Sequence, residues 1–515
     1  MNNWKYAITA LTAALVLAGC GGGSTTPDNT VRGTLQSSPT LKASLTAAAF
    51  KTSLQSSGLL PVTGDPTCGV DVQYLQYATV GGAGEKTTAS GALMTPTGTD
   101  PKCTGARPIV LYAHGTNITK TYNMAALNEP ANAAYGEAVL VAAMYAAQGY
   151  IVIAPNYAGY DSSSLSYHPY LNADQQSKEM IDILAAAKKA MPSLAVPKTD
   201  NGKLFITGYS QGGHVAMATH RAMQVAGMPV TAAAPMSGPY ALAAQGDATY
   251  YGNVNLGSTI FSPMINTSFQ KAYGNLYVTP ADIYEPAFAT GIETLLPGTY
   301  DFTSVVTNVK LPQLALFNST PPTAPVGSPA SLQPTLNAIT PIPNNPLSAL
   351  GFGAGNLIKN SARLSFLLDA IANPDGLVPS VTSGVVATNP QNPLRVAAKL
   401  NDLRNWKPTS PVLLCGGNAD PTVFFNVNTQ GMQGLWTAPS PLAPLAGVLT
   451  VLDVDSAPTG ATDPFAAAKV GFAQLKASTA AAAGAGAAAA VVNAYHGTLV
   501  PPFCNAAARG FFANF

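Results

Sequence analysis

The sequence predicts an α/β fold with a mostly parallel central sheet, helices on both faces and one large insertion. Continuously apolar runs typical of buried strands alternate with helical stretches from about residue 108 to 235. This alternation stops from about Leu242 to Trp406, where Pro, Thr and Asn are frequent, and it resumes at Pro411. One strand-to-helix junction carries the pattern Gly-x-Ser-x-Gly, at residues 208–212. Because strands that alternate with helices form parallel sheets, these observations favour the α/β class.

The N-terminal residues 1–20 are predicted to be a lipoprotein signal peptide. Lys5 provides a positive charge, residues 7–16 are apolar, and Leu-Ala-Gly-Cys at 17–20 resembles a bacterial lipobox that would make Cys20 the lipidated residue. An ordinary secretory signal with a nearby cysteine is the alternative. Residues 21–45 begin with glycines and are predicted to be a flexible tether. Gly21 after the cysteine favours, by resemblance to bacterial lipoproteins, the outer membrane.

The first part of the core is predicted to extend from residue 46 to 243. Residues 71–78 and 86–95 alternate as an antiparallel strand pair does. Further strands are expected at 108–113, 150–155, 204–207 and 230–235, separated by helices at 133–148, 173–190 and 214–225. The second part, 406–515, contributes strands at 411–415 and 449–454.

The pattern at 208–212 follows an apolar strand and precedes a helix, which is the context of the nucleophile elbow in an α/β-hydrolase. The glycines permit a tight turn that projects the hydroxyl of Ser210 above the sheet. An ordinary turn of small residues is the alternative. Residues 244–405 are predicted to be a cap inserted after the sixth strand, with one clear helix near 355–372, and to cover Ser210. A decoration away from the site is the alternative.

A reactive serine needs a base and a carboxylate, which follow it in this order: Ser, then Asp or Glu, then His. His496 is the one histidine beyond the helix at 214–225, and it is predicted to be the base. Asp420 follows the strand at 411–415 and is predicted to be the acid. The competing acids are Asp453, Asp455 and Asp463. The other histidines are predicted to be structural: His114, His168, His214 and His220.

Two backbone N–H groups are needed to stabilise a developing oxyanion. Gln211 supplies one by its position after the serine. Residues 113–116, Ala-His-Gly-Thr, resemble the His-Gly motif of lipases and esterases, so Thr116 is predicted to supply the second, with Gly115 as the alternative. The aromatic residues around His168 are alternatively expected to line an acyl site.

The cysteines after Cys20 are even in number, which predicts two disulfides in an exported chain. Sequence order alone allows three pairings. If the loops of Asp420 and His496 meet, Cys415 and Cys504 also come close, which favours Cys415–Cys504 and leaves Cys68–Cys103. No cysteine or histidine spacing indicates a zinc site.

The net charge of +1 gives no indication of a nucleic-acid partner. After the signal, no stretch is predicted to span a membrane, because the Ala-rich run near 480–492 is weakly apolar and contains Gly484 and Gly486.

Three segments together resemble the bacterial branch of the secreted lipase family, in lipoprotein form: 154–159, 167–170 and 208–214. The similarity extends over about residues 70–240 and 411–505. It implies a carboxylic-ester hydrolase that works through an acyl-enzyme, without a metal or an organic cofactor. Asn156 departs from the pattern, in which an aspartate is expected.

The function predicted is therefore that of an exported, membrane-tethered esterase or lipase, at the bacterial outer membrane or cell surface. Its expected substrates are apolar esters, whether lipid, small ester or polyester. A serine peptidase of the same fold is one alternative, and a surface-binding lipoprotein without activity is another. Nothing in the sequence indicates an oligomeric state.

Overall fold

The computed structural model describes residues 31–515. The predicted signal peptide, Cys20 and the beginning of the predicted tether lie outside the described residues. A nine-stranded sheet forms the centre of the molecule, with the order β1-β2-β3-β5-β4-β6-β7-β8-β9. The strands are β1 (Thr40–Leu45), β2 (Gly69–Val80), β3 (Lys86–Thr97), β4 (Ala106–Ala113), β5 (Ile151–Pro155), β6 (Thr199–Tyr209), β7 (Ala232–Met236), β8 (Val412–Gly416) and β9 (Leu449–Asp453).

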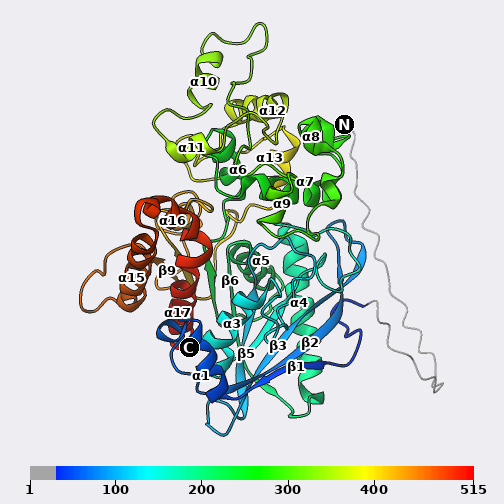
Figure 1. The fold of residues 1–515 in the computed structure, drawn as a ribbon, viewed down its shortest axis with the longest axis vertical. Coiled ribbons are helices and arrows are strands. Elements are labelled where there is room, and N and C mark those ends of the chain that lie inside the picture. Colours follow the sequence, from blue (N-terminus) through cyan, green and yellow to red (C-terminus); the bar gives the residue numbers. More distant parts are fainter. Residues whose placement is uncertain (1–30) are drawn as a thin grey trace, which may run out of the picture.

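Pairing is antiparallel from β1 to β5 and parallel from β5 to β9. The helices α4 (Ala173–Ala190) and α5 (Gln211–Val225) pack together on one face of the sheet. The helices α3 (Tyr135–Met144) and α17 (Val500–Phe512) pack together on the other face (Figure 1). The predicted fold class, a mostly parallel sheet with helices on both faces, is confirmed. β5, β7 and β8 have five residues each, and every one of these residues is buried, as expected for strands covered on both sides.

The tether prediction is wrong at its C-terminal end, because residues 40–45 form β1 and pair with β2. Thr40 lies opposite Tyr74 and Leu45 opposite Val70, so this edge strand satisfies the outer hydrogen-bonding groups of β2. The short helices α1 (Ala47–Ser56) and α2 (Leu60–Thr63) follow. Residues 40–45 contain no glycine or proline, which is compatible with a strand. Their apolar and polar residues do not alternate clearly enough to predict one.

The insertion between β7 and β8 forms a second hydrophobic core above the sheet (Figure 1). Because β1 adds a strand, the insertion follows the seventh strand rather than the sixth. Its helices are α6 (Leu242–Tyr250), α7 (Ser258–Tyr273), α8 (Pro286–Ala289), α9 (Ser304–Thr307), α10 (Leu332–Ala338), α11 (Pro346–Leu350), α12 (Asn360–Ala372) and α13 (Pro393–Leu400). The sequence predicted only the region of α12. Prolines that indicated loops begin α8, α11 and α13, where a missing N–H costs no hydrogen bond.

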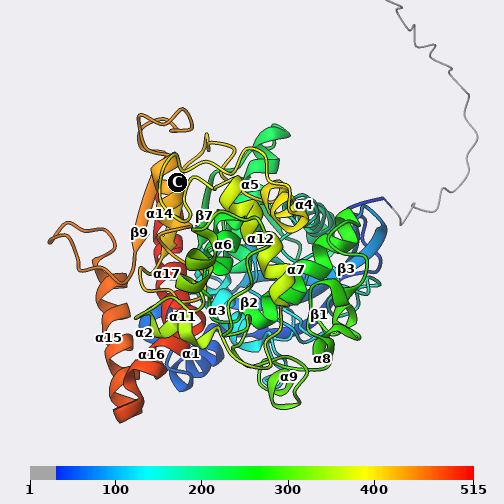
Figure 2. The same cartoon turned by 90° about the horizontal axis from the view of Figure 1, so that it is seen from above.

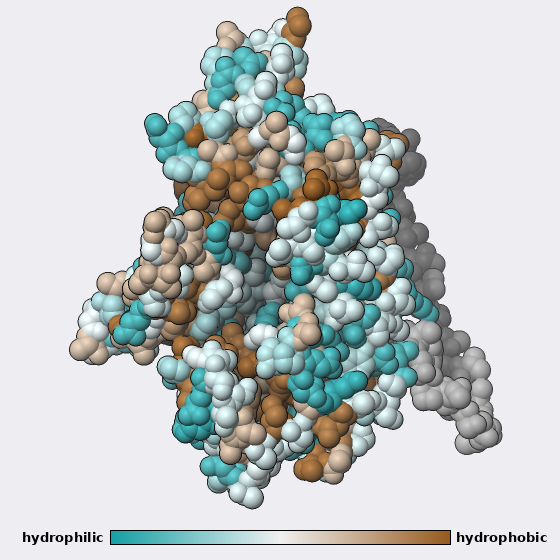
Figure 3. All heavy atoms as spheres, in the orientation of Figure 1, coloured by the Kyte–Doolittle hydropathy of each residue, from teal (hydrophilic) through white to brown (hydrophobic). Residues whose placement is uncertain are grey.

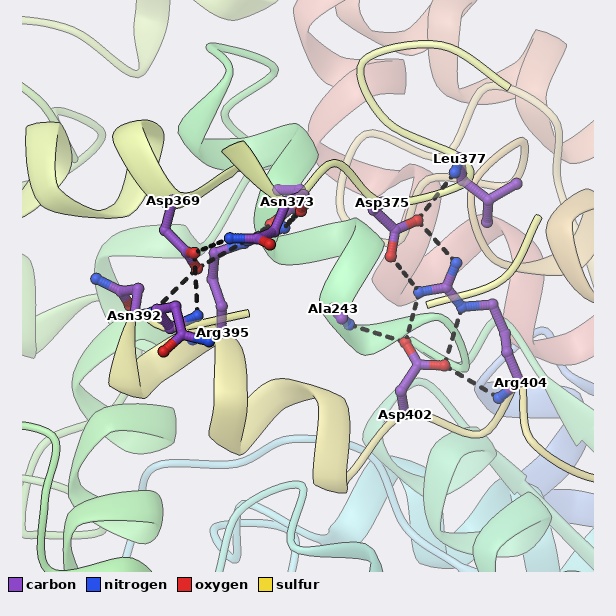
Figure 4. A network of polar contacts seen from close by, with 11 residues as sticks. Ala243, Asp369, Asn373, Asp375, Leu377, Asn392, Arg395, Asp402 and Arg404 are labelled. Carbon is purple, nitrogen blue, oxygen red and sulfur yellow. Dashed lines mark hydrogen bonds and ion pairs between the residues drawn. The ribbon is translucent and has the colours of Figure 1, made fainter. Parts of the chain in front are cut away.

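Two buried arginines join distant parts of this insertion at its base (Figure 4). Arg395 on α13 pairs with Asp247 on α6 and with Asp369 on α12, each at 2.8 Å. Arg404 pairs with Asp375 at 2.7 Å and with Asp402 at 2.9 Å, and all three side chains are fully buried. The segment that enters the insertion and the segment that leaves it are thereby held together.

The C-terminal part contains α14 (Thr429–Leu435), α15 (Ala466–Ala483), α16 (Ala487–Ala494) and α17. Within the described residues, the run from Ala466 to Phe512 is long and apolar enough to cross a membrane by length and composition alone. It is not one straight helix, because the chain turns at Gly484–Gly486 and α16 returns beside α15 (Figure 2). α17 packs against β6, β7 and β8.

Candidate active site

Ser210 lies between the last residue of β6 and the first residue of α5, at φ +59° and ψ −122°. A positive φ is rare for a residue with a side chain and is typical of a strained functional turn. The glycines on either side are required by space. A Cβ at Gly212 would lie 2.0 Å from the carbonyl oxygen of Ala113, and one at Gly208 would lie 2.4 Å from that of Gly212. The sequence therefore folds into a turn that only this glycine pattern permits.

Ser210, His496 and Asp420 form a continuous chain of hydrogen bonds. The Ser210 Oγ lies 2.7 Å from the His496 Nε2, and the His496 Nδ1 lies 2.6 Å from the Asp420 Oδ2. The second carboxylate oxygen accepts the backbone N–H groups of Thr422 and Val423, at 2.9 and 3.0 Å. Because an ionised carboxylate only accepts hydrogen bonds, it selects the tautomer with the proton on Nδ1, which leaves Nε2 able to take the serine proton.

The competing acids are engaged elsewhere. Asp453 accepts from the backbone N–H and the side chain of Asn418, at 3.1 and 2.7 Å. Asp455 pairs with Lys476 at 2.7 Å and accepts from the Tyr495 hydroxyl at 2.7 Å. Asp463 pairs with Lys469 at 2.8 Å. The Tyr495 hydroxyl also accepts from the backbone of Ala419, so this neighbour of His496 holds the loop that carries Asp420.

Two backbone N–H groups beside Ser210 are available for an oxyanion. The N–H of Gln211 belongs to the first turn of α5, where no helical carbonyl can accept from it. The N–H of Thr116 makes no hydrogen bond to the described residues. By contrast, the N–H of Gly115 donates to the Glu137 Oε1 at 3.0 Å, so this alternative donor is already used.

Residues that the sequence did not assign to the site hold these two donors. Glu137 also accepts from the hydroxyls of Tyr112 and Tyr122, at 2.9 and 2.8 Å. The Nε2 of His168 lies 2.6 Å from the side-chain nitrogen of Gln211, and the Tyr170 hydroxyl lies 2.8 Å from the Thr116 Oγ1. The segment at 167–170 therefore touches both halves of the oxyanion region.

Burial keeps the histidines outside the Ser210–His496 pair neutral. The pKa of His168 falls to about 3 because its ring is fully desolvated, and its Nδ1 lies 2.9 Å from the carbonyl of Ala158. Burial also lowers the pKa of His114, and it lowers the pKa of His214 and of His220 to about 4. Neutral His168 donates from Nδ1 to that carbonyl and accepts the amide of Gln211 at Nε2.

The contacts of Asn156 explain why this position holds an asparagine and not the expected aspartate. Its side-chain nitrogen donates to the Ser90 Oγ at 2.9 Å and to the Asn123 Oδ1 at 3.1 Å, while its oxygen accepts the N–H of Met124 at 2.7 Å. An ionised aspartate has no proton to donate to these oxygens. The residue lies at the end of β5 and makes no contact with the Ser210 chain of hydrogen bonds.

Both disulfides form with the favoured pairing. Cys68 bonds Cys103, and Cys415 bonds Cys504. The second bond joins the end of β8, just before the loop of Asp420, to α17, just after His496. It therefore links the two segments that bring the acid and the histidine together.

Two cavities meet at Ser210 and share the side chains of Phe261 and Thr422. The wide cavity has a volume of about 1600 Å³ and also contains His496. The narrow cavity has a volume of about 110 Å³ and extends into the insertion between α6, α7 and α12. Its walls are largely apolar, with Leu242 and Phe269 among them. The described residues contain no group of three or more histidine, cysteine or acidic side chains placed to bind a metal.

Comparison with known proteins agrees with this architecture. The model of the prolyl oligopeptidase family matches residues 138–234, which extend from α3 to β7. Comparison with curated sequences gives no match. The rice cell wall degrading esterase LipA from Xanthomonas oryzae, in a ligand-bound form, aligns at 24% identity over 93% of this chain and 98% of its own, with a TM-score of 0.66.

A candidate hydrolase from Legionella pneumophila aligns at 18% identity over 81% of this chain and 92% of its own, with a TM-score of 0.56. At such identities the likeness concerns the fold. The strand order, the turn at Ser210 and these structural similarities lead to one conclusion. The chain has the α/β-hydrolase fold.

Proposed function

We propose that this protein is a serine carboxylic-ester hydrolase that acts on apolar esters through an acyl-enzyme. The observation that carries the proposal is the position of the Ser210 hydroxyl. It lies on a strained turn within hydrogen-bond distance of His496, at the point where an apolar cavity begins. A nucleophile, a base with an orienting carboxylate, and an apolar binding site are the parts that such an enzyme needs.

In the proposed reaction, the Ser210 Oγ attacks the ester carbonyl carbon while His496 Nε2 takes its proton. The N–H groups of Gln211 and Thr116 stabilise the negative oxygen of the tetrahedral intermediate. When the intermediate collapses, the bond to the alcohol oxygen breaks and His496 returns the proton to that oxygen. A water molecule then attacks the acyl-enzyme by the same steps, which release the acid and restore the serine. Asp420 orients His496 and stabilises its positive charge.

The narrow cavity supports an acyl chain rather than a polar group as the part bound beside Ser210. Leu242, Phe269, Phe366 and Leu394 lie in its wall, and the described residues that line it include no acidic or basic side chain. Burial of each methylene group of an acyl chain contributes about 0.8 kcal/mol. Acyl chains of increasing length should therefore bind more tightly until the cavity is full.

Export through a lipoprotein signal, with attachment at Cys20, belongs to the same proposal. The two disulfides support an oxidising compartment. Cys20→Ala should release the protein from the membrane fraction, and mass spectrometry of the N-terminal peptide should find a lipid on the unaltered protein. An unmodified cysteine would contradict the attachment without affecting the proposed chemistry.

A serine peptidase is the second candidate, because the matched family is that of the prolyl oligopeptidases. The match covers the segment around the nucleophile, which peptidases and esterases of this fold share. The insertion that covers Ser210 in this chain is helical, with a largely apolar cavity. This cavity favours an acyl chain over a peptide backbone, which would need hydrogen-bonding partners.

The test compares p-nitrophenyl esters, from acetate to palmitate, with an aminoacyl p-nitroanilide. We expect ester hydrolysis that depends on acyl length, and a loss of kcat of roughly 10⁶-fold in Ser210→Ala. Ser193→Ala, an exposed serine outside both cavities, is the matched control and should retain activity. Cleavage of the anilide alone would support the peptidase. A protein inert to both substrates and to fluorophosphonate labelling would indicate a binding protein without catalysis.

A further inference from the structure

From the wide cavity we infer the other half of the substrate: it accepts a long, uncharged alcohol portion of the ester, such as the chain of an aliphatic polyester. This inference rests on the proposed function and adds the substrate class. Small-molecule sites usually have volumes of about 300–1,000 Å³. The wide cavity, at about 1600 Å³, exceeds that range and is open to the surface. Figure 3 shows the molecule hollowed between the insertion, the C-terminal helices and the sheet domain.

One face of α15 forms a wall of this cavity. Ala467, Gly471, Gln474 and Ser478 line it at the spacing of successive helical turns. The first and last of these positions are separated by roughly 16 Å along the helix axis. The side chains at the two ends of this face, Ala467 and Ser478, are small, which leaves room for a chain beside the helix. A wall of this length is much longer than a methyl or glyceryl alcohol requires.

Further walls come from parts of the chain outside α15, and one residue in them, Phe503, packs directly against Gly471. Leu59, in the connection between α1 and α2, and Val62, in α2, contribute to them. α17 contributes Phe503, and the edge of the insertion contributes Phe302. The lining also includes small polar groups such as Ser57, so it suits a chain that carries both methylene and ester groups.

The charge of the lining excludes ionic substrates. Among the described residues that line the cavity, Glu137 has the one carboxyl group and His496 the one imidazole. Both oxygens of Glu137 are occupied by hydrogen bonds from Gly115, Tyr112 and Tyr122. Within the described part of the chain, no lysine, arginine or aspartate lines this cavity, so a polyanion or polycation would find no counter-charge there.

Ser210 lies where the narrow and wide cavities meet, which assigns the two halves of the ester. The acyl group and the alcohol group leave the carbonyl carbon in different directions. The narrow apolar cavity limits the size of the group that it holds, whereas the wide cavity is open at its outer end. The alcohol side can therefore extend out of the molecule, as it must when a polyester is cut one acyl unit from the hydroxyl end of its chain.

The test uses three substrates with a six-carbon acyl group: methyl hexanoate, trihexanoin, and a soluble linear oligomer of caprolactone. Ala467→Trp and Ser478→Trp place a large side chain on the wall of the wide cavity. We expect each to lower the ratio of kcat/KM for the oligomer to that for methyl hexanoate by about tenfold, equivalent to about 1.4 kcal/mol. Ala473→Trp and Ala477→Trp are exposed on α15 outside the lining and should leave the ratio unchanged.

The outcomes separate the inference from the proposed function. If no ester is cleaved, the proposed function fails. If esters are cleaved but the ratio is the same in all four variants, the wide cavity does not bind the alcohol portion. If the tryptophan variants lower kcat/KM for trihexanoin but not for the oligomer, the substrate is a glyceride and the inference of a polymer is overturned. If these variants lower kcat/KM for the oligomer more than for trihexanoin, the inference is supported.

Discussion

At the scale of the residue, the candidate site divides into side chains that sequence can identify and side chains that it cannot. Ser210, Asp420 and His496 are predictable because the turn needs its glycines, and because only one histidine lies far enough downstream. Glu137 and His168 carry no comparable signal. Glu137 is one acid on an otherwise apolar helix, and its three hydrogen-bond donors come together only when β4 and α3 pack.

The contact between Gln211 and His168 leads to a prediction on the oxyanion region. Gln211→Leu keeps the backbone N–H but removes the side-chain bond to His168. The turn should then hold that N–H less firmly, and we expect kcat to fall about tenfold with KM nearly unchanged, a smaller loss than the roughly 10²–10³-fold for a removed donor because the N–H itself remains. Steady-state kinetics on a p-nitrophenyl ester measure both constants.

A matched control is His168→Gln, because a glutamine amide oxygen reaches the position of the imidazole Nε2 and can still accept from Gln211. Since the pKa of His168 is lowered to about 3 by burial, His168 is neutral throughout the range of an activity assay. The acidic limb of the kcat/KM profile should therefore stay in place in both variants. A shift of that limb would mean that His168 takes part in proton transfer, which the geometry does not support.

At the scale of the element, predictability depends on how strongly a segment repeats its pattern. The strands β4, β5, β7, β8 and β9 and the second half of β6 are short, apolar and bounded by turns, so the sequence indicates each of them. The edge strand β1 has one buried side chain, Ala43, and gives no such signal. In the insertion, α6, α7 and α13 were missed because prolines and polar residues hide their periodicity. α6 and α13 are joined by the ion pair of Asp247 with Arg395, whose members lie far apart in sequence.

The packing of α4 on β2 buries a carboxyl group and makes stability depend on pH. Glu179 is fully buried, where it accepts from the Tyr77 hydroxyl at 3.2 Å and from the Gln175 amide at 3.0 Å. Desolvation raises its pKa to about 8. Between its ordinary pKa and 8, the folded state holds a proton that the unfolded state releases, so stability decreases as the pH rises through this window.

Glu179→Gln removes this dependence while keeping the shape of the side chain. Relative to the variant, the free energy of unfolding of the unaltered protein should fall by about 1.4 kcal/mol per pH unit between about pH 5 and 8. Chemical denaturation at several pH values measures the difference. Glu129→Gln, at an exposed glutamate, should show the same pH dependence as the unaltered protein. Parallel curves for Glu179→Gln would contradict a protonated buried carboxyl.

At the scale of the whole molecule, the site lies at the junction of two hydrophobic cores. One core holds the sheet and the helices on its faces, and the other holds the insertion. The sequence indicates that there are two parts, because the alternation of strands and helices stops near residue 242 and resumes at residue 411. It does not indicate how the two ends of the insertion are held together, because the buried ion pairs at its base link residues as distant as Asp247 and Arg395. These ion pairs favour an insertion that stays fixed, with substrate entering through the wide cavity.

Arg404→Met tests whether this base holds the insertion in place. The guanidinium of Arg404 is fully buried between Asp375 and Asp402, so its removal leaves two carboxylates without a counter-charge. We expect the free energy of unfolding to fall by about 3–5 kcal/mol. Because the insertion has its own core, hydrogen exchange should become faster in α7 and α12 before it does in β6 and β7.

A suitable control for Arg404→Met is Lys178→Met, which breaks an ion pair of 2.6 Å with Asp174 in which both side chains are exposed. Exposed pairs contribute about 0–1 kcal/mol, so this variant should resemble the unaltered protein. If Arg404→Met lowers stability no more than Lys178→Met does, the buried pairs do not hold the base. If exchange instead accelerates equally in α12 and β6, the insertion and the sheet domain unfold as one unit. In that case the stability of the whole molecule, and not the buried arginines, would keep the insertion in place.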